Sequence, residues 1–248
     1  MEVICNTVVF QEGQLTRLMV DFEKGVWKAF KEQFPSIPIV GCNFHHLQAM
    51  RRNLQSIGLV SLYGQDLNFQ YAVKLIYAMS YVPAGEVRNC FRDVVIPAFK
   101  ELEKEEYFDD YSDEIDQFLS YVKRTWIGRA DRQPTYALKT WNKHSEVVAD
   151  KCLTNNVVES FNSSWTDSLT RRPSLYEVLG GFKRKEAVSE LELREECLAV
   201  GVNSVTDNSS RNRRRSEQRA DLKKLCQSFE AMSARSYMDS IIPFLSQG

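Results

Sequence analysis

Three short segments of the sequence carry side chains whose types and spacing suit metal-dependent chemistry. Asp21 directly follows an apolar run, Cys42 and His45 form a Cys-x-x-His turn, and Glu159 lies in the run Asn-Asn-Val-Val-Glu-Ser-Phe-Asn. Carboxylate oxygens suit hard cations such as Mg²⁺ and Mn²⁺, whereas thiolate and imidazole groups suit Zn²⁺. These four residues are the candidates that the fold must position.

The elements around Asp21 and Cys42 read as a strand, a helix and a second strand. Residues 15–20 are an apolar-rich run, apolar residues recur at helical spacing from Asp21 to Phe34, and residues 37–42 form a second apolar run. This spacing predicts a βαβ unit with two adjacent parallel strands. Ligands of α/β proteins gather at the carboxyl ends of such strands, where Asp21 is placed.

Both acidic candidates also have a purely structural interpretation. Asp21 could cap the helix that follows it, a common role for Asp. Asn156 and Glu159 have the spacing of a capping box, in which the Glu reaches back to the first residue of the helix. Glu23 is expected to be a surface acid favoured by the helix dipole.

The cysteine and histidine residues do not predict a zinc site. A structural zinc ion takes four ligands, and Cys42 and His45 supply two. His144 and Cys152 are the other candidates, but their spacing is not that of a tight ligand pair. His46 is expected to be a surface residue at a helix start. A Cys nucleophile with a His base is a further alternative, but nothing supplies an oxyanion hole.

The stretch over residues 47–150 predicts a large all-helical block. Four amphipathic segments cover about residues 47–57, 67–81, 87–102 and 115–126, and Pro97 is expected to kink or divide the third. The acidic patch over residues 101–116 is expected to be solvated. Trp126 and Trp141 either pack between parts of the fold or stack on nucleic-acid bases.

Clusters of arginine are the candidates for nucleic-acid binding. They are Arg171 and Arg172, and a run of four within five residues, Arg211, Arg213, Arg214 and Arg215. The net charge is −1, so binding to a polyanion would require such a local basic surface. The second cluster also fits a nuclear-localisation element or a solvated tail.

Composition indicates a soluble intracellular protein. The chain has 248 residues, 43% of them apolar, with few glycines and prolines, which favours helix over a many-turned β fold. The six cysteines are scattered rather than arranged as a secreted disulfide framework. No apolar run is long enough to span a bilayer, and the N-terminus does not resemble a signal peptide, so no membrane partner is expected.

The ordered set of motifs resembles the Mutator-like element (MULE) transposases. The resemblance spans about residues 15–185 and is carried by Asp21-Phe22-Glu23, Phe34-Pro35, Gly41-Cys42-Asn43-Phe44-His45, Gly58-Leu59, Val82-Pro83, Trp126-Ile127-Gly128, Trp141-Asn142, the run from Asn155 to Asn162, and Pro173-Ser174-Leu175. It implies an RNase H-like core interrupted by a helical insertion. It also implies nuclear DNA strand cleavage and transfer, in which three carboxylates hold two Mg²⁺ or Mn²⁺ ions.

By this resemblance Asp21 matches the second catalytic carboxylate and Glu159 the third, with Cys42 and His45 nearby. The first carboxylate has no counterpart, because the acids before Asp21 are Glu2 and Glu12. We therefore expect a chain that is inactive alone. A domesticated or residual module that binds DNA or protein without catalysis is the alternative, and a non-functional fragment is a third reading.

The expected fold class is α/β, predominantly helical, with a partial RNase H-like core. Residues 1–46 would form the second half of that core and residues 47–150 the helical insertion. Residues 151–200 would return to the core with Glu159, and residues 201–248 would be a polar, basic linker and tail. DNA is the expected partner, and a homo-oligomer is left open.

Overall fold

The computed structural model describes residues 17–129, 131–151, 153, 167, 169–170, 172–184 and 210–245. The chain divides into two compact units, one of residues 1–154 with 218–248 and one of residues 155–217. The expected core segment (residues 1–46) and the expected helical insertion (residues 47–150) therefore belong to the same unit as the end of the chain. Its described residues are mostly helical, with one small parallel sheet.

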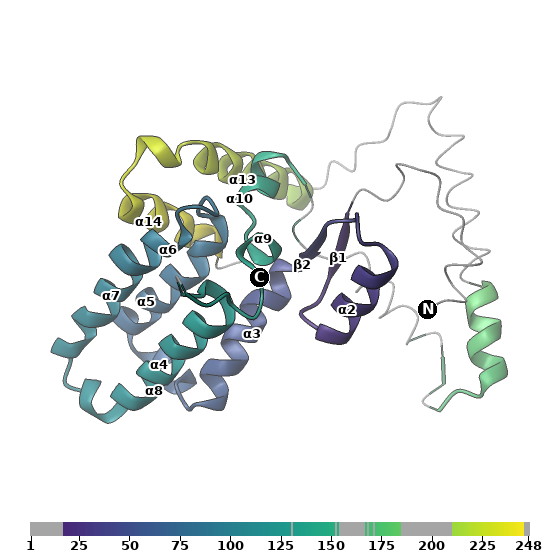
Figure 1. The fold of residues 1–248 in the computed structure, drawn as a ribbon, viewed down its shortest axis with the longest axis horizontal. Helices are drawn as coiled ribbons and strands as arrows, with labels where there is room; N and C mark the ends of the chain where they lie inside the picture. Colours follow the sequence, from purple (N-terminus) through teal and green to yellow (C-terminus); the bar gives the residue numbers. More distant parts are fainter. Residues whose placement is uncertain are drawn as a thin grey trace. The chain divides into compact units, whose positions relative to one another are not determined.

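The expected strand–helix–strand unit is confirmed in the first compact unit (Figure 1). Strand β1 (Leu18–Val20) pairs in parallel with β2 (Ile39–Gly41), and helix α2 (Lys24–Gln33) connects them. Val20 lies opposite Gly41, so both strands end at the same edge of the sheet. In the described part of the chain the sheet has these two strands.

Asp21 does not cap the helix that follows it. Helix α2 begins at Lys24, and Glu23 occupies the capping position without a side-chain cap hydrogen bond. The Trp27 indole Nε1 donates to the Asp21 carbonyl oxygen at 2.6 Å, which fixes the chain where it leaves β1. The role of the Asp21 carboxylate therefore lies elsewhere than at the start of α2.

The rest of the first unit is a helical body that begins directly after β2. Its helices are α3 (Asn43–Ser56), α4 (Val60–Gln65), α5 (Leu67–Ala78), α6 (Val87–Cys90), α7 (Ile96–Glu101), α8 (Phe108–Val122), α9 (Leu138–Trp141) and α10 (His144–Val148). Helix α5 is at the centre of this body, and seven of its twelve residues are buried. The expected all-helical block is thus present, with its first helix starting earlier than predicted.

Pro97 divides the third predicted helix in the way the sequence suggests. A π-helical turn (Phe91–Val95) separates α6 from α7, and Pro97 lies in the first turn of α7. Proline has no N–H group and its ring crowds the carbonyl one turn earlier, so the wider turn accommodates it. The segment still buries Phe91, Val94 and Val95.

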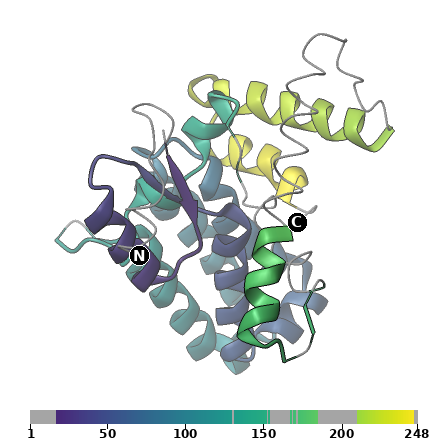
Figure 2. The same ribbon diagram turned by 90° about the vertical axis from the view of Figure 1, so that its right-hand side faces the viewer.

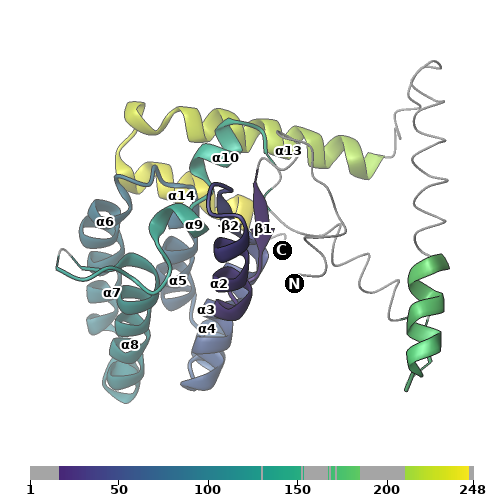
Figure 3. The same ribbon diagram turned by 45° about the vertical axis from the view of Figure 1, so that its right-hand side comes forward.

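The end of the chain is a pair of helices and not a polar tail. Helices α13 (Ser210–Gln227) and α14 (Ala234–Leu245) are joined by a short 3₁₀ turn, and α14 packs against α5 (Figures 2 and 3). Tyr237, Met238 and Ile241 are fully buried. The expected tail over residues 201–248 is therefore wrong for its last part, because the apolar side of α14 completes the core.

In the second compact unit the structure describes a helix over residues 175–184. Ser174 and Glu177 cap it reciprocally: the Ser174 N–H donates to the Glu177 carboxylate at 2.7 Å, and the Glu177 N–H donates to the Ser174 hydroxyl at 3.3 Å. This is a capping box. The serine after Pro173 thus sets the start of this helix.

Candidate metal centre

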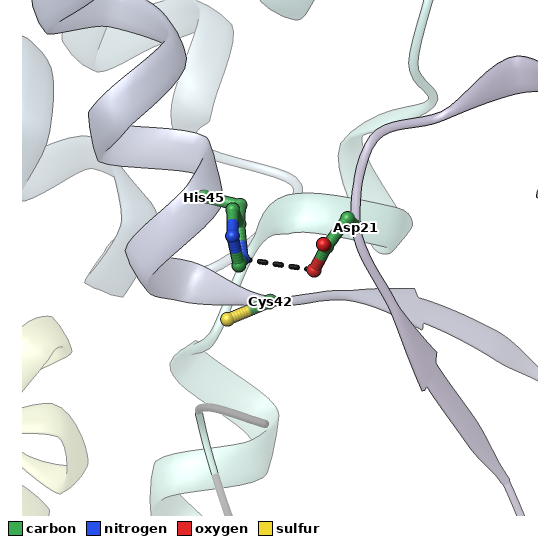
Figure 4. Close-up of side chains that lie close together, drawn as sticks. All are labelled: Asp21, Cys42 and His45. Atoms are coloured by element: carbon green, nitrogen blue, oxygen red, sulfur yellow. Dashed lines mark ion pairs between the residues drawn. The ribbon is translucent and has the colours of Figure 1, made fainter. Parts of the chain in front are cut away.

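Three potential metal ligands meet at the carboxyl ends of the two strands (Figure 4). Asp21 follows β1, Cys42 follows β2, and His45 lies in the first turn of α3. Their ligand atoms all lie within 4.8 Å of one another, and the Asp21 carboxylate is 2.8 Å from His45 Nδ1. Among the residues that the structure describes, this is the one group of three or more such side chains.

The backbone of the βαβ unit sets this geometry. The Cys42 N–H donates to the Val20 carbonyl at 2.9 Å, which continues the strand pairing by one step. Cys42 is the capping residue of α3, and His45 is three positions later, so both lie on the same side of the helix start. The thiol is fully buried, while the Asp21 and His45 side chains are 42% and 22% exposed. The group is therefore reached from the side of the carboxylate.

A close contact between the Phe22 ring and Gly41 holds the ends of β1 and β2 together. A methyl group at Gly41 would lie 2.1 Å from the Phe22 ring, so only glycine leaves room for that ring. Phe22 also packs edge-on against Trp126 and Tyr136, and the Tyr136 hydroxyl donates to the Phe22 carbonyl at 2.6 Å. These contacts hold Asp21, the residue before Phe22, beside β2.

A buried charge network supports the end of β2, and sequence reasoning missed it. The Lys143 ammonium is fully buried and donates to the Gly41 carbonyl at 2.6 Å and to the Glu146 carboxylate at 3.1 Å. Arg17 donates to the other Glu146 oxygen at 2.9 Å. Burial lowers the pKa of Lys143, and the Glu146 carboxylate opposes that shift. The sequence gives no indication that Lys143 is buried, because a lysine just before a short helix is usually exposed to solvent.

His46 is a core residue and not the expected surface residue. Its ring is fully buried beside Trp126 and Trp141, with ring centroids 4.4 and 4.6 Å away. Burial, assisted by the nearby Lys143 ammonium, lowers the pKa of His46 to about 3, so the ring is neutral at pH 7. The prediction failed because helix α3 starts at Asn43, four residues earlier than expected, which turns His46 inward.

Trp126 and Trp141 pack in the core and do not form a base-stacking surface. They are 1% and 0% exposed, and the Trp141 indole donates to the Trp126 carbonyl at 3.1 Å. Gly128, two residues after Trp126, has φ +77°, and a side chain there would collide with Pro134. The packing interpretation is therefore confirmed for both tryptophans.

The other candidate residues fall into two sets, those outside the described residues and those that the structure places away from the Asp21 group. Glu159, Cys152 and Arg171 lie outside the described residues, as do the side chains of Arg211 and Arg215. The His144 ring contacts the Cys226 carbonyl at 2.9 Å. Arg172, Arg213 and Arg214 are exposed, and Arg213 pairs with Glu217 at 3.0 Å.

The helices in the described part of the chain include none that could span a membrane. No protein-family model, no curated protein and no solved structure matches the chain. The features of the chain that bear on its function are therefore the motifs in the sequence and the geometry at the ends of β1 and β2.

Proposed function

We propose that this chain is a transposase-derived protein of the MULE type, whose ancestral activity is metal-dependent cleavage and transfer of DNA strands. One observation supports this most directly. Asp21 follows the first of two parallel strands, at the edge where an RNase H-like core would carry a catalytic carboxylate. The helical body that follows β2 corresponds to the insertion that the family resemblance implies.

By the family resemblance, Asp21 and Glu159 would be the carboxylates that hold Mg²⁺ or Mn²⁺. Such ions activate a water molecule or a 3′-hydroxyl and stabilise the leaving oxygen. His45, 2.8 Å from Asp21, orients that carboxylate toward the open side of the group. The exposed residues Arg172, Arg213 and Arg214 provide phosphate contacts, and a nuclear location follows from a DNA substrate.

A second candidate is a DNA-binding module without catalysis. It is favoured by the composition of the Asp21 group, which contains one carboxylate beside a thiol and an imidazole. Two-metal chemistry requires several carboxylates to offset the repulsion between the ions. In this form the arginine residues bind DNA, alone or within a homo-oligomer, and no strand is cut.

Nicking of supercoiled plasmid DNA by the full-length chain with Mn²⁺ or Mg²⁺ distinguishes the two candidates. The missing first carboxylate predicts that the chain alone nicks weakly or not at all, and any nicking should disappear in Asp21→Asn and in Glu159→Gln. Glu23→Gln is the matched control, because Glu23 is an exposed acid two residues from Asp21. Nicking that survives Asp21→Asn contradicts the proposed site.

Salt-dependent DNA binding tests the second candidate. The double variant Arg213→Ala/Arg214→Ala is expected to bind more weakly, and each phosphate that it no longer neutralises should lower the slope of log affinity against log salt by about 1. Arg51→Ala/Arg52→Ala removes two adjacent exposed arginines of α3 and serves as its control. A chain that binds DNA without nicking it supports the module, and one that does neither excludes both candidates.

A further inference from the structure

We infer that Asp21, Cys42 and His45 form a binding site for a single zinc ion. This inference does not depend on DNA chemistry. The sequence alone did not predict a zinc site, because Cys42 and His45 supply two of the four ligands that a structural zinc ion takes. The structure adds a third ligand from the end of β1, since Asp21 lies within 4.8 Å of both.

The ligand set is the kind that a zinc ion takes when one coordination position stays open. Such sites have three protein ligands of nitrogen, sulfur or oxygen and a water or another group in the fourth position. Sulfur and nitrogen ligands disfavour Mg²⁺, which requires oxygen ligands in near-ideal octahedral geometry. The carboxylate side of the group is its exposed side, so the open position faces solvent.

The observed spacing requires a small adjustment to bind the ion. Ligand bonds of about 2.0–2.3 Å in a tetrahedron place ligand atoms about 3.3–3.8 Å apart. Asp21 and His45 are 2.8 Å apart and the sulfur lies within 4.8 Å of both, so shifts of roughly 1 Å in side-chain position suffice. The Asp21 and His45 side chains are partly exposed, which leaves room for such shifts.

Charge balance at the group also suits a divalent ion. A carboxylate and a thiolate together cancel the charge of Zn²⁺, with a neutral imidazole as the third ligand. The Lys143 ammonium interacts electrostatically with Cys42 and is tied to the Gly41 carbonyl, next to that thiol. The Glu146 carboxylate pairs with this ammonium at 3.1 Å, so the positive charge of Lys143 is balanced by Glu146 and does not upset the charge balance of the metal ligands.

Cysteine nucleophilic chemistry is a weaker use of the same three residues. Cys42 is fully buried, so its sulfur cannot approach a macromolecular substrate. A metal ion is small enough to reach a buried sulfur from the side of Asp21. A bound zinc ion would also occupy the carboxylate that Mg²⁺ or Mn²⁺ requires, so zinc is expected to inhibit any nicking activity.

Binding of Co²⁺ to the untagged, metal-free chain tests the site, because cobalt reports its ligands by absorption. We expect a thiolate-to-cobalt band and the visible bands of tetrahedral cobalt at one equivalent, both displaced by Zn²⁺. Cys42→Ser should abolish the thiolate band. Asp21→Asn and His45→Gln should each weaken zinc binding by about tenfold or more, since even outer-shell partners contribute that much.

Cys90→Ser is the matched control, because Cys90 is also a buried free thiol but lies outside the group. A thiolate band that persists in Cys42→Ser, or that is lost in Cys90→Ser, overturns the assignment. If the wild-type chain binds no cobalt or zinc, the group is an Asp–His ion pair beside a buried thiol and the inference fails.

X-ray absorption of the zinc-loaded wild-type chain gives a test that needs no variant. One sulfur at about 2.3 Å with nitrogen or oxygen ligands at about 2.0–2.1 Å is expected. A first shell without sulfur overturns the inference, even where a variant fails to fold. Neither measurement involves DNA, so a chain that binds zinc but does not nick plasmid separates this inference from the proposed function.

Discussion

At the scale of single residues, the position of Asp21 depends on its neighbours more than on its own side chain. The Trp27 indole donates to the Asp21 carbonyl. The next residue, Phe22, packs against Trp126 and Tyr136. The carboxylate is thereby presented to His45 from a fixed backbone. Substituting the carboxylate should therefore change metal binding with little effect on the fold, whereas substitutions around Phe22 should disturb both.

Gly41→Ala is the sharpest residue-scale prediction. Its methyl group would lie 2.1 Å from the Phe22 ring, so either the ring or strand β2 must move. Overpacking of this kind costs roughly 1–3 kcal/mol in the free energy of unfolding, which urea denaturation followed by circular dichroism measures. Weaker metal binding should accompany this destabilisation, because Cys42 follows Gly41 directly.

Gly25→Ala is the control for that substitution. Gly25 lies in α2 and has nothing within 4 Å of the position of the added methyl. Alanine is a better helix former than glycine by up to about 1 kcal/mol, so this variant should be neutral or slightly stabilised. Equal destabilisation of the two variants would show that the Phe22 contact does not decide the geometry.

At the scale of elements, a network of hydrogen bonds and ion pairs joins the sheet to the helical body. Lys143, which precedes α10, reaches the last carbonyl of β2, while Glu146 reaches back to Arg17 before β1. The two strands are short, and a pair of strands alone is only marginally stable in water. The network therefore substitutes for part of the stabilisation that further strands would provide.

Lys143→Met tests this connection. The variant leaves the Gly41 carbonyl without its donor and Glu146 without one of its partners, which is expected to cost about 3–5 kcal/mol. The double variant Lys143→Met/Glu146→Gln should cost less than the sum of the single changes, with a coupling energy of about 0.5–3 kcal/mol in unfolding measurements. Lys139→Met, an exposed lysine of α9, is the control and should have little effect.

The elements also show where sequence reasoning succeeded. Hydrophobic periodicity predicted the βαβ unit and most of the helical body, because these patterns reflect local geometry. It did not predict that α3 begins at Asn43, which turned His46 inward, nor that α14 completes the core. The family resemblance placed Cys42 and His45 near Asp21, but the distances among the three side chains depend on the register of β1 against β2. Lys143 carried no local pattern, since its burial depends entirely on tertiary contacts.

At the scale of the whole molecule, Tyr81 joins three distant parts of the first unit. Its hydroxyl accepts from Asn43 of α3 at 3.0 Å, and its carbonyl accepts from the Tyr237 hydroxyl of α14 at 2.5 Å. Burial raises the pKa of Tyr81 to about 12, partly opposed by the hydrogen bond from Asn43. Tyr81 thus links α14 to the residue that directly follows Cys42.

The raised pKa of Tyr81 predicts a decrease in stability in alkali. The unfolded chain releases the phenolic proton near pH 10, whereas the folded chain keeps it until about pH 12. The contribution of this hydroxyl is therefore fully present below pH 10 and falls by about 1.4 kcal/mol per pH unit above it. Urea unfolding at pH 8 and pH 11 measures the change.

Tyr81→Phe provides the comparison. At pH 8 it should cost about 1–3 kcal/mol, because the Asn43 amide is left without its buried partner, and this cost should shrink at pH 11. Tyr176→Phe should have no effect at either pH, since Tyr176 is 85% exposed. A cost for Tyr81→Phe that is the same at both pH values would contradict the predicted ionisation.

The contact between Tyr237 and Tyr81 also has a consequence for synthesis of the chain on the ribosome. The two residues are 156 positions apart, and a ribosome adding about 5–20 residues per second needs roughly 8–30 s to cover that distance. During that time the face of α5 that α14 covers has no partner. The nascent protein should therefore be a substrate for chaperones that bind exposed apolar helices, until α14 emerges and docks.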